Sequence, residues 1–136
     1  MGGGQILLQE KIIFGELSMS RKPIEKELTN TRLLKEYASW IYCDKCNSTV
    51  AYLCYVTYDE FAFEYKCKCQ NVGHVHIKFE NDNNVKKSSE PLVEIKNRLC
   101  CRIDNSPLVT VVAKNLQEYK LSVACNKCDT QYQMNS

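Results

Sequence analysis

The sequence has no strong excess of charge and no long apolar run. Its 136 residues carry 18 Lys and Arg against 16 Asp and Glu, so it lacks the electrostatic footprint of a strongly basic nucleic-acid binder. No apolar segment approaches the roughly 20 residues that a helix needs to span a bilayer. We therefore expect neither a membrane span nor a purely electrostatic mode of binding.

Motifs typical of enzymes are missing as well. With two histidines in the whole chain, there is no HExxH, no HxE followed by PCxxC, no glycine loop for phosphate and no nucleophile elbow. Both CxxC motifs adjoin predicted strands, whereas a redox CxxC needs a helix N-terminus to lower the thiol pKa. We therefore predict that the protein is not an enzyme, with no catalytic residues and no small-molecule substrate.

Cysteine, in contrast, is abundant, with nine in the chain. The odd number, the short CxxC and CxC spacings and the absence of a secretory signal favour reduced thiols that bind metal over a disulfide framework. We therefore expect a cytoplasmic protein with one or two structural Zn²⁺ ions.

The N-terminal part, residues 1–41, is expected to pack on a zinc-binding region. Clumped apolar residues predict one or two strands within residues 5–17. The serines before Arg21 can cap a helix, and Ile24, Leu28, Leu34 and Ile41 then fall at approximately helical spacing. The predicted fold is therefore mainly β with an N-terminal α-helical segment.

The rest of the chain divides into two similar parts. Residues 42–81 predict a first zinc-binding unit, with a strand at 50–58, a turn at Asp59-Glu60, and further strands at 61–67 and 72–80. The polar residues 82–91 predict a loop or linker. Residues 92–136 predict a second unit, with strands at 92–103, 108–113 and 119–125. The heptads CDKCNST and CNKCDTQ suggest an internal duplication.

The motif CDKC followed by CKC indicates a metal site, because four thiolates brought together favour tetrahedral zinc. This arrangement resembles the zinc-ribbon superfamily, clearly over residues 43–69 and in part over residues 100–128. The resemblance implies small antiparallel sheets stapled by four-cysteine zinc sites, with Cys43, Cys46, Cys67 and Cys69 as ligands of the first. The sequence departs from the family pattern because Gly is missing after each CxxC and CxC replaces the second CxxC.

The second half leaves several ligand sets open. Cys125 and Cys128 form one half of a site, and their expected partners are Cys100 and Cys101. Adjacent residues of a regular strand point to opposite faces, so either a bulge brings both to the metal or only one is a ligand. Two further arrangements remain open, namely an interlaced pair of sites joining residues 43 and 46 to residues 125 and 128, and a single four-cysteine site.

Three further residues have competing interpretations. Cys54 lies within a predicted strand and is expected to be a buried apolar residue. His74 and His76 share a strand face that we expect to be polar and exposed. If Cys69 is not a ligand, His74 is the natural replacement.

Three functions remain open. The near-neutral charge favours a zinc-dependent protein-interaction module that regulates a larger machine, and two loaded four-cysteine sites would lower the net charge from +2 to about −2. The alternative is a zinc-ribbon nucleic-acid-binding protein, with aromatic residues such as Tyr55 and Tyr58 for stacking. Its candidate phosphate contacts are Lys66, Lys68, Lys86, Lys87, Arg98 and Arg102. A third possibility is a redox- or metal-responsive switch.

Overall fold

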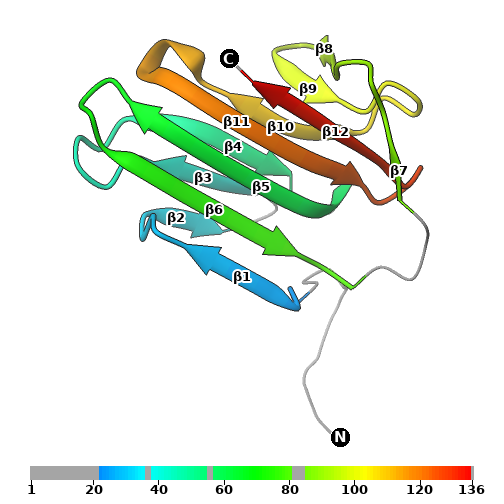
Figure 1. Cartoon of the computed structure of the whole chain (residues 1–136), viewed down its shortest axis with the longest axis horizontal. Coiled ribbons are helices and arrows are strands. Elements are labelled where there is room, and N and C mark those ends of the chain that lie inside the picture. The colour runs from blue at the N-terminus through cyan, green and yellow to red at the C-terminus, as the bar shows by residue number, and fades with distance from the viewer. Residues whose placement is uncertain (1–21, 36–37, 55–56, 81–84, 136) are drawn as a thin grey trace, which may run out of the picture.

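The protein folds into two six-stranded β-sheets packed face to face. The structure is a computed structural model that describes residues 22–35, 38–54, 57–80 and 85–135 (Figure 1). In sheet A the order is β1 (Glu25–Leu28), β6 (Val72–Lys78), β5 (Tyr58–Cys67), β11 (Leu116–Cys125), β12 (Thr130–Asn135) and β7 (Lys86–Lys87). In sheet B it is β2 (Leu33–Lys35), β3 (Ala38–Tyr42), β4 (Thr49–Cys54), β10 (Pro107–Val111), β9 (Arg98–Cys100) and β8 (Val93–Ile95).

The alternating pattern of β5 shows why the two layers pack. Phe61, Phe63 and Tyr65 are buried between the sheets, whereas Glu64 on the opposite face is exposed. Across the other layer, Leu53 of β4 is fully buried. Because successive side chains of a strand point to opposite faces, this period-two pattern places one apolar face of each sheet in a shared core.

The two halves of the chain are related by a regular offset: residue n of the first half corresponds to residue n + 58 of the second. The starts of the paired strands show this offset, with β4 and β10 at Thr49 and Pro107, β5 and β11 at Tyr58 and Leu116, and β6 and β12 at Val72 and Thr130. The predicted duplication therefore has a structural counterpart, although the match runs through residues 101–107 rather than through CNKCDTQ.

The halves meet at the centre of each sheet. In the antiparallel β5–β11 pair, Phe61 lies opposite Val123 and Tyr65 lies opposite Tyr119. At the offset of 58, Phe61 is equivalent to Tyr119 and Tyr65 to Val123, so the offset converts one of these residue pairs into the other. Such a reciprocal match places a local twofold axis at the middle of the pair. Strands β4 and β10 pair antiparallel in the same way at the centre of sheet B. Each sheet therefore contains strands from both halves.

The mainly β prediction is confirmed, but the N-terminal helix is wrong within the described residues. Strands β1, β2 and β3 occupy the segment expected to be helical. Strand β1 pairs with β6, and β2 pairs with β3, which pairs with β4. The segment gains backbone hydrogen bonds at the sheet edges, and such tertiary pairing overrides a weak helical periodicity. The strands expected within residues 5–17 lie outside the described residues.

Two turns lie at positions other than those predicted from the sequence. Asp59 and Glu60 belong to β5 rather than to a turn, so that strand begins earlier than its sequence suggests. The single strand expected at 92–103 is instead a hairpin of β8 and β9, joined at Lys96 and Asn97, which both have positive φ. A two-residue turn with two positive φ angles matches the twist of a hairpin.

Candidate metal sites

The candidate ligands lie on four short turns, which we call knuckles: residues 43–48, 67–71, 101–106 and 125–130. The knuckles at 43–48 and 101–106 connect neighbouring strands of sheet B, and the other two connect neighbouring strands of sheet A. Each candidate site combines one knuckle from each sheet. A metal bound there would therefore join the two layers at one end of the molecule.

The backbone of the knuckles explains the residues that follow the ligands. Asn47, Gln70, Asn105 and Asp129 all have positive φ, between 55° and 80°. In the knuckle at 43–48, the Asn47 N–H donates to Cys43 O at 2.9 Å and the Cys43 N–H to Ser48 O at 2.8 Å. Glycine is the usual residue in such a conformation, and asparagine tolerates it best among the others. The missing glycines are therefore replaced mainly by Asn and Asp.

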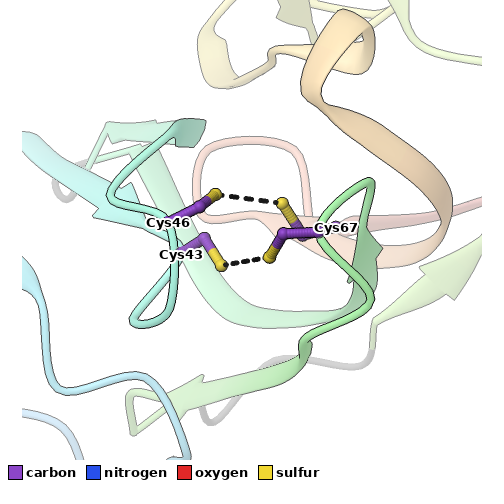
Figure 2. Close-up of side chains that lie close together, drawn as sticks. Cys43, Cys46 and Cys67 are labelled. Carbon is purple, nitrogen blue, oxygen red and sulfur yellow. Dashed lines mark hydrogen bonds between the residues drawn. The ribbon is translucent and has the colours of Figure 1, made fainter.

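Cys43, Cys46, Cys67 and Cys69 form site 1. All four sulfur atoms lie within 4.8 Å of one another. Cys43 Sγ is 3.5 Å from Cys69 Sγ, and Cys46 Sγ is 3.5 Å from Cys67 Sγ. Figure 2 shows the two knuckles facing each other with their sulfur atoms pointing into the space between them. The CDKC and CKC motifs and the zinc-ribbon resemblance predicted this set, and the structure brings its four sulfur atoms together.

The separations at site 1 fit a metal better than a disulfide. A disulfide needs a sulfur–sulfur distance of about 2.05 Å, whereas tetrahedral zinc with Zn–S bonds of about 2.3 Å places its sulfurs about 3.8 Å apart. The observed 3.5 Å lies close to the second value, and all nine cysteines are free. The chain therefore carries a four-thiol group that could hold a metal such as zinc.

Hydrogen bonds around site 1 favour thiolates at two of its cysteines. The Ser48 hydroxyl lies 3.0 Å from Cys46 Sγ, and Ser48 lowers the pKa of the Cys46 thiol to about 6. The Asn71 side-chain amide donates to Cys43 Sγ at 3.4 Å. Burial, in contrast, raises the pKa of Cys67 to about 12. A bound divalent cation would offset the cost of that buried charge, as it does in structural zinc sites.

Site 2, at the opposite end of the β5–β11 pair, contains Cys101, Asp104, Cys125 and Cys128. One ligand atom from each lies within 4.8 Å of the others. Cys101 Sγ is 3.0 Å from Cys128 Sγ, and an Asp104 carboxylate oxygen is 3.5 Å from Cys125 Sγ. Carboxylate oxygen is an accepted zinc ligand beside thiolates, so this group could also hold a metal.

Hydrogen bonds at site 2 stabilise the negatively charged forms of two candidate ligands, Cys101 and Asp104. The Arg102 N–H donates to the Tyr132 oxygen at 2.9 Å, which leaves the Tyr132 hydroxyl free to donate to Cys101 Sγ at 3.3 Å. Burial opposes ionisation of Asp104, but hydrogen bonds from Ser106 outweigh it and hold the pKa of this carboxyl below its ordinary value. Asp104 is therefore a carboxylate at neutral pH.

Cys100 lies outside the group, contrary to its expected place among the ligands. It is the last residue of β9, whereas Cys101 begins the knuckle, so only one of the adjacent cysteines reaches the site. Asp104 was missed. The signal that could have identified it is the match of Cys101-x-x-Asp104-Asn-Ser to Cys43-x-x-Cys46-Asn-Ser at the offset of 58.

The remaining polar candidates have other partners. His76 Nε2 lies 3.1 Å from Glu60 Oε2, and His74 Nδ1 lies 3.8 Å from Glu64 Oε2, both on the outer face of sheet A. Neither histidine belongs to a metal group among the described residues. Cys54, expected in the core, is half-buried, and burial raises the pKa of its thiol.

The expected nucleic-acid contacts do not share one face. Lys66 is on β5, Lys86 and Lys87 form β7 at the edge of sheet A, and Arg98 is on β9 of sheet B. Lys68 lies in the knuckle at 67–71, and the Arg102 Nε donates to Glu90 at 2.7 Å. Tyr58 is fully buried, and Tyr55 lies outside the described residues.

The charge of the loaded protein differs slightly from the sequence expectation. Seven thiolates and two divalent cations would change the formal net charge from +2 to about −1, because Asp104 is already counted among the acidic residues.

No family model, curated protein or solved structure matches the chain. Among the described residues, no helix combines the length and apolar character that crossing a bilayer requires.

Proposed function

We propose that this is a non-enzymatic, zinc-ribbon-like protein in which two zinc ions fix a β-sandwich that binds a partner protein. Each zinc would hold two knuckles from different sheets, which resembles the way paired knuckles hold the ion in zinc ribbons. Four-thiolate coordination at site 1 leaves no open position for a substrate, which supports a structural role for that ion. Reduced, metal-bound thiols also suit a cytoplasmic location.

The observation that carries the binding proposal is a row of side chains on the outer face of sheet B. Leu34 pairs with Trp40, and Trp40 with Tyr52. Leu34 is 59% exposed and Trp40 is 42% exposed. The Trp40 and Tyr52 rings pack edge to face with centroids 4.4 Å apart, and Arg98 Cζ lies 6.0 Å from the Tyr52 centroid. We call these four residues the aromatic row.

The composition of the aromatic row matches a protein interface. Trp, Tyr and Arg are the residues most enriched among those that dominate binding energy, and they are most effective when already ordered before binding. The edge-to-face packing of Trp40 on Tyr52 holds both rings in place. A partner that covers the row would therefore gain apolar contact area at a small conformational cost.

The decisive experiment replaces Trp40, which is the only tryptophan. A photo-crosslinking residue at position 34 of the zinc-loaded protein should capture the same partner in wild type and in the control V72E, whose site is 67% exposed and lies on β6 of sheet A. W40E should lose that partner. Capture that is unchanged in W40E would contradict the proposal.

A second measurement separates the nucleic-acid alternative. Single- and double-stranded oligonucleotides are titrated into the zinc-loaded protein at low and moderate salt, with Trp40 fluorescence as the signal. We expect no binding. Binding that weakens with salt and is lost in Arg98→Ala would favour nucleic acid instead, because phosphate contacts release counterions.

A further inference from the structure

The knuckles at 43–48 and 101–106 are equivalent except at one candidate ligand. Cys46 and Asp104 occupy the same position at the offset of 58, between an identical first Cys and an identical Asn-Ser pair. The backbone is also the same: Asn105 N–H donates to Cys101 O at 2.9 Å and Cys101 N–H to Ser106 O at 2.9 Å, as in the first knuckle. Site 2 therefore has a carboxylate where site 1 has the Cys46 sulfur, and its other two cysteines are spaced as CxxC rather than CxC.

That replacement weakens one bond to a soft metal. Thiolate is the softer ligand and binds zinc, cadmium and copper(I) more firmly than a carboxylate does. Asp104 is also exposed, and one of its oxygens accepts a hydrogen bond from the Ser106 N–H at 3.0 Å. Water can therefore compete with this exposed carboxylate for the metal.

We propose that site 2 is an exchangeable metal site in which Asp104 gives way to an external ligand, such as water or a thiolate, whereas site 1 exchanges its ion slowly. Asp104 is thus the residue that sets the lability of the second ion. The proposal rests on zinc binding in the proposed function but not on the partner protein. Exchange at site 2 would let the protein accept or release one metal ion while site 1 keeps the layers joined at the other end.

The test measures zinc release from the fully loaded protein to a chromogenic chelator. We expect two phases of one zinc each, a fast phase from site 2 and a slow phase from site 1, because the carboxylate is the weaker ligand for zinc. Asp104→Cys should convert both ions to slow release, and the matched variant Cys46→Asp should convert both to fast release. A single phase in the wild type, or a fast phase that persists in Asp104→Cys, would overturn the proposal.

A measurement without variants covers the case in which a substitution prevents folding. Cadmium NMR of the wild-type protein should give two resonances, one in the four-thiolate range and one displaced upfield by an oxygen ligand. Two resonances in the four-thiolate range would contradict the role of Asp104. Failure to take up any metal would instead refute the proposed function itself, and an absent protein partner would leave these readings unaffected.

Discussion

Phe63 of β5 lies directly opposite Leu121 of β11, and these two residues are equivalent in the two halves of the chain. The local twofold axis therefore passes through this pair, at the centre of sheet A. The Phe63 ring centroid is 5.3 Å from that of Tyr65 and 5.9 Å from that of Tyr119, so one side chain contacts aromatic residues from both halves.

Phe63→Ala should therefore weaken the junction between the halves. Phe63 is fully buried, and removal of such a ring costs about 3–5 kcal/mol through lost burial and the cavity left behind. Urea unfolding of the zinc-loaded protein measures this change. Val72→Ala, at an exposed position, serves as the control and should change stability by less than about 0.5 kcal/mol. Equal stability of the two variants would contradict this account of the core.

Metal content should distinguish ligand cysteines from the others. Cys43→Ser and Cys101→Ser should each bind one zinc fewer than wild type and lose about 3 kcal/mol or more of stability, because metal-binding energy contributes directly to folding. Cys54→Ser and Cys100→Ser should keep both ions, since neither belongs to a metal group. Native mass spectrometry counts the ions. Loss of a zinc from Cys100→Ser would place that residue back among the ligands.

Acid should release zinc from site 1 at a pH that Ser48 controls. In the metal-free protein, Ser48 lowers the pKa of Cys46 to about 6, so the stability that this thiolate contributes is complete above the ordinary thiol pKa and is lost as the pH falls through 6. Ser48→Ala should raise that pKa and move the release midpoint to higher pH, because protons then compete more effectively with the metal for the Cys46 sulfur. Ser89→Ala, at an exposed position, is the control. A midpoint that does not move, or moves downward, would contradict the role of Ser48.

The left-handed residues of the knuckles should resist β-branched substitution. Asn47 and Asn105 have φ of 65° and 60°, a conformation that costs a side chain with a branched Cβ about 1–2 kcal/mol. Asn47→Val and Asn105→Val should therefore lower the free energy of unfolding by about that amount, whereas Asn47→Gly should be nearly neutral. Gln133→Val, on an exposed strand position, is the control. Thermal denaturation of the loaded proteins compares the four.

Local patterns were sufficient to predict the cysteines of site 1 and the strands β4, β5 and β6 beside it, although not β3. The CxxC and CxC spacings indicate pairs of cysteines that can reach one metal, and the alternation of Phe61, Phe63 and Tyr65 indicates which face of β5 is buried. Asn47, which follows the first CxxC, has the left-handed conformation that few residues other than glycine adopt.

The parts that sequence reasoning missed depend on residues far apart in the chain. Strand β1 forms by pairing with the edge strand β6, and the local sequence of residues 25–28 does not predict that this edge is available. Asp104 differs from the other acidic residues by its position in the fold, where one carboxylate oxygen lies 3.5 Å from Cys125 Sγ. The register of β5 with β11 likewise appears only when both halves are aligned at the offset of 58.

The twofold arrangement has a consequence for the origin of the chain. A single half would leave β4 and β5 as open edges, each with the backbone groups that its counterpart now satisfies. Two copies of one half could meet across those edges and give a homodimer with two identical metal centres. The present protein has the symmetry expected of such an ancestral dimer after fusion, and Asp104 is one of the positions at which its two halves now differ.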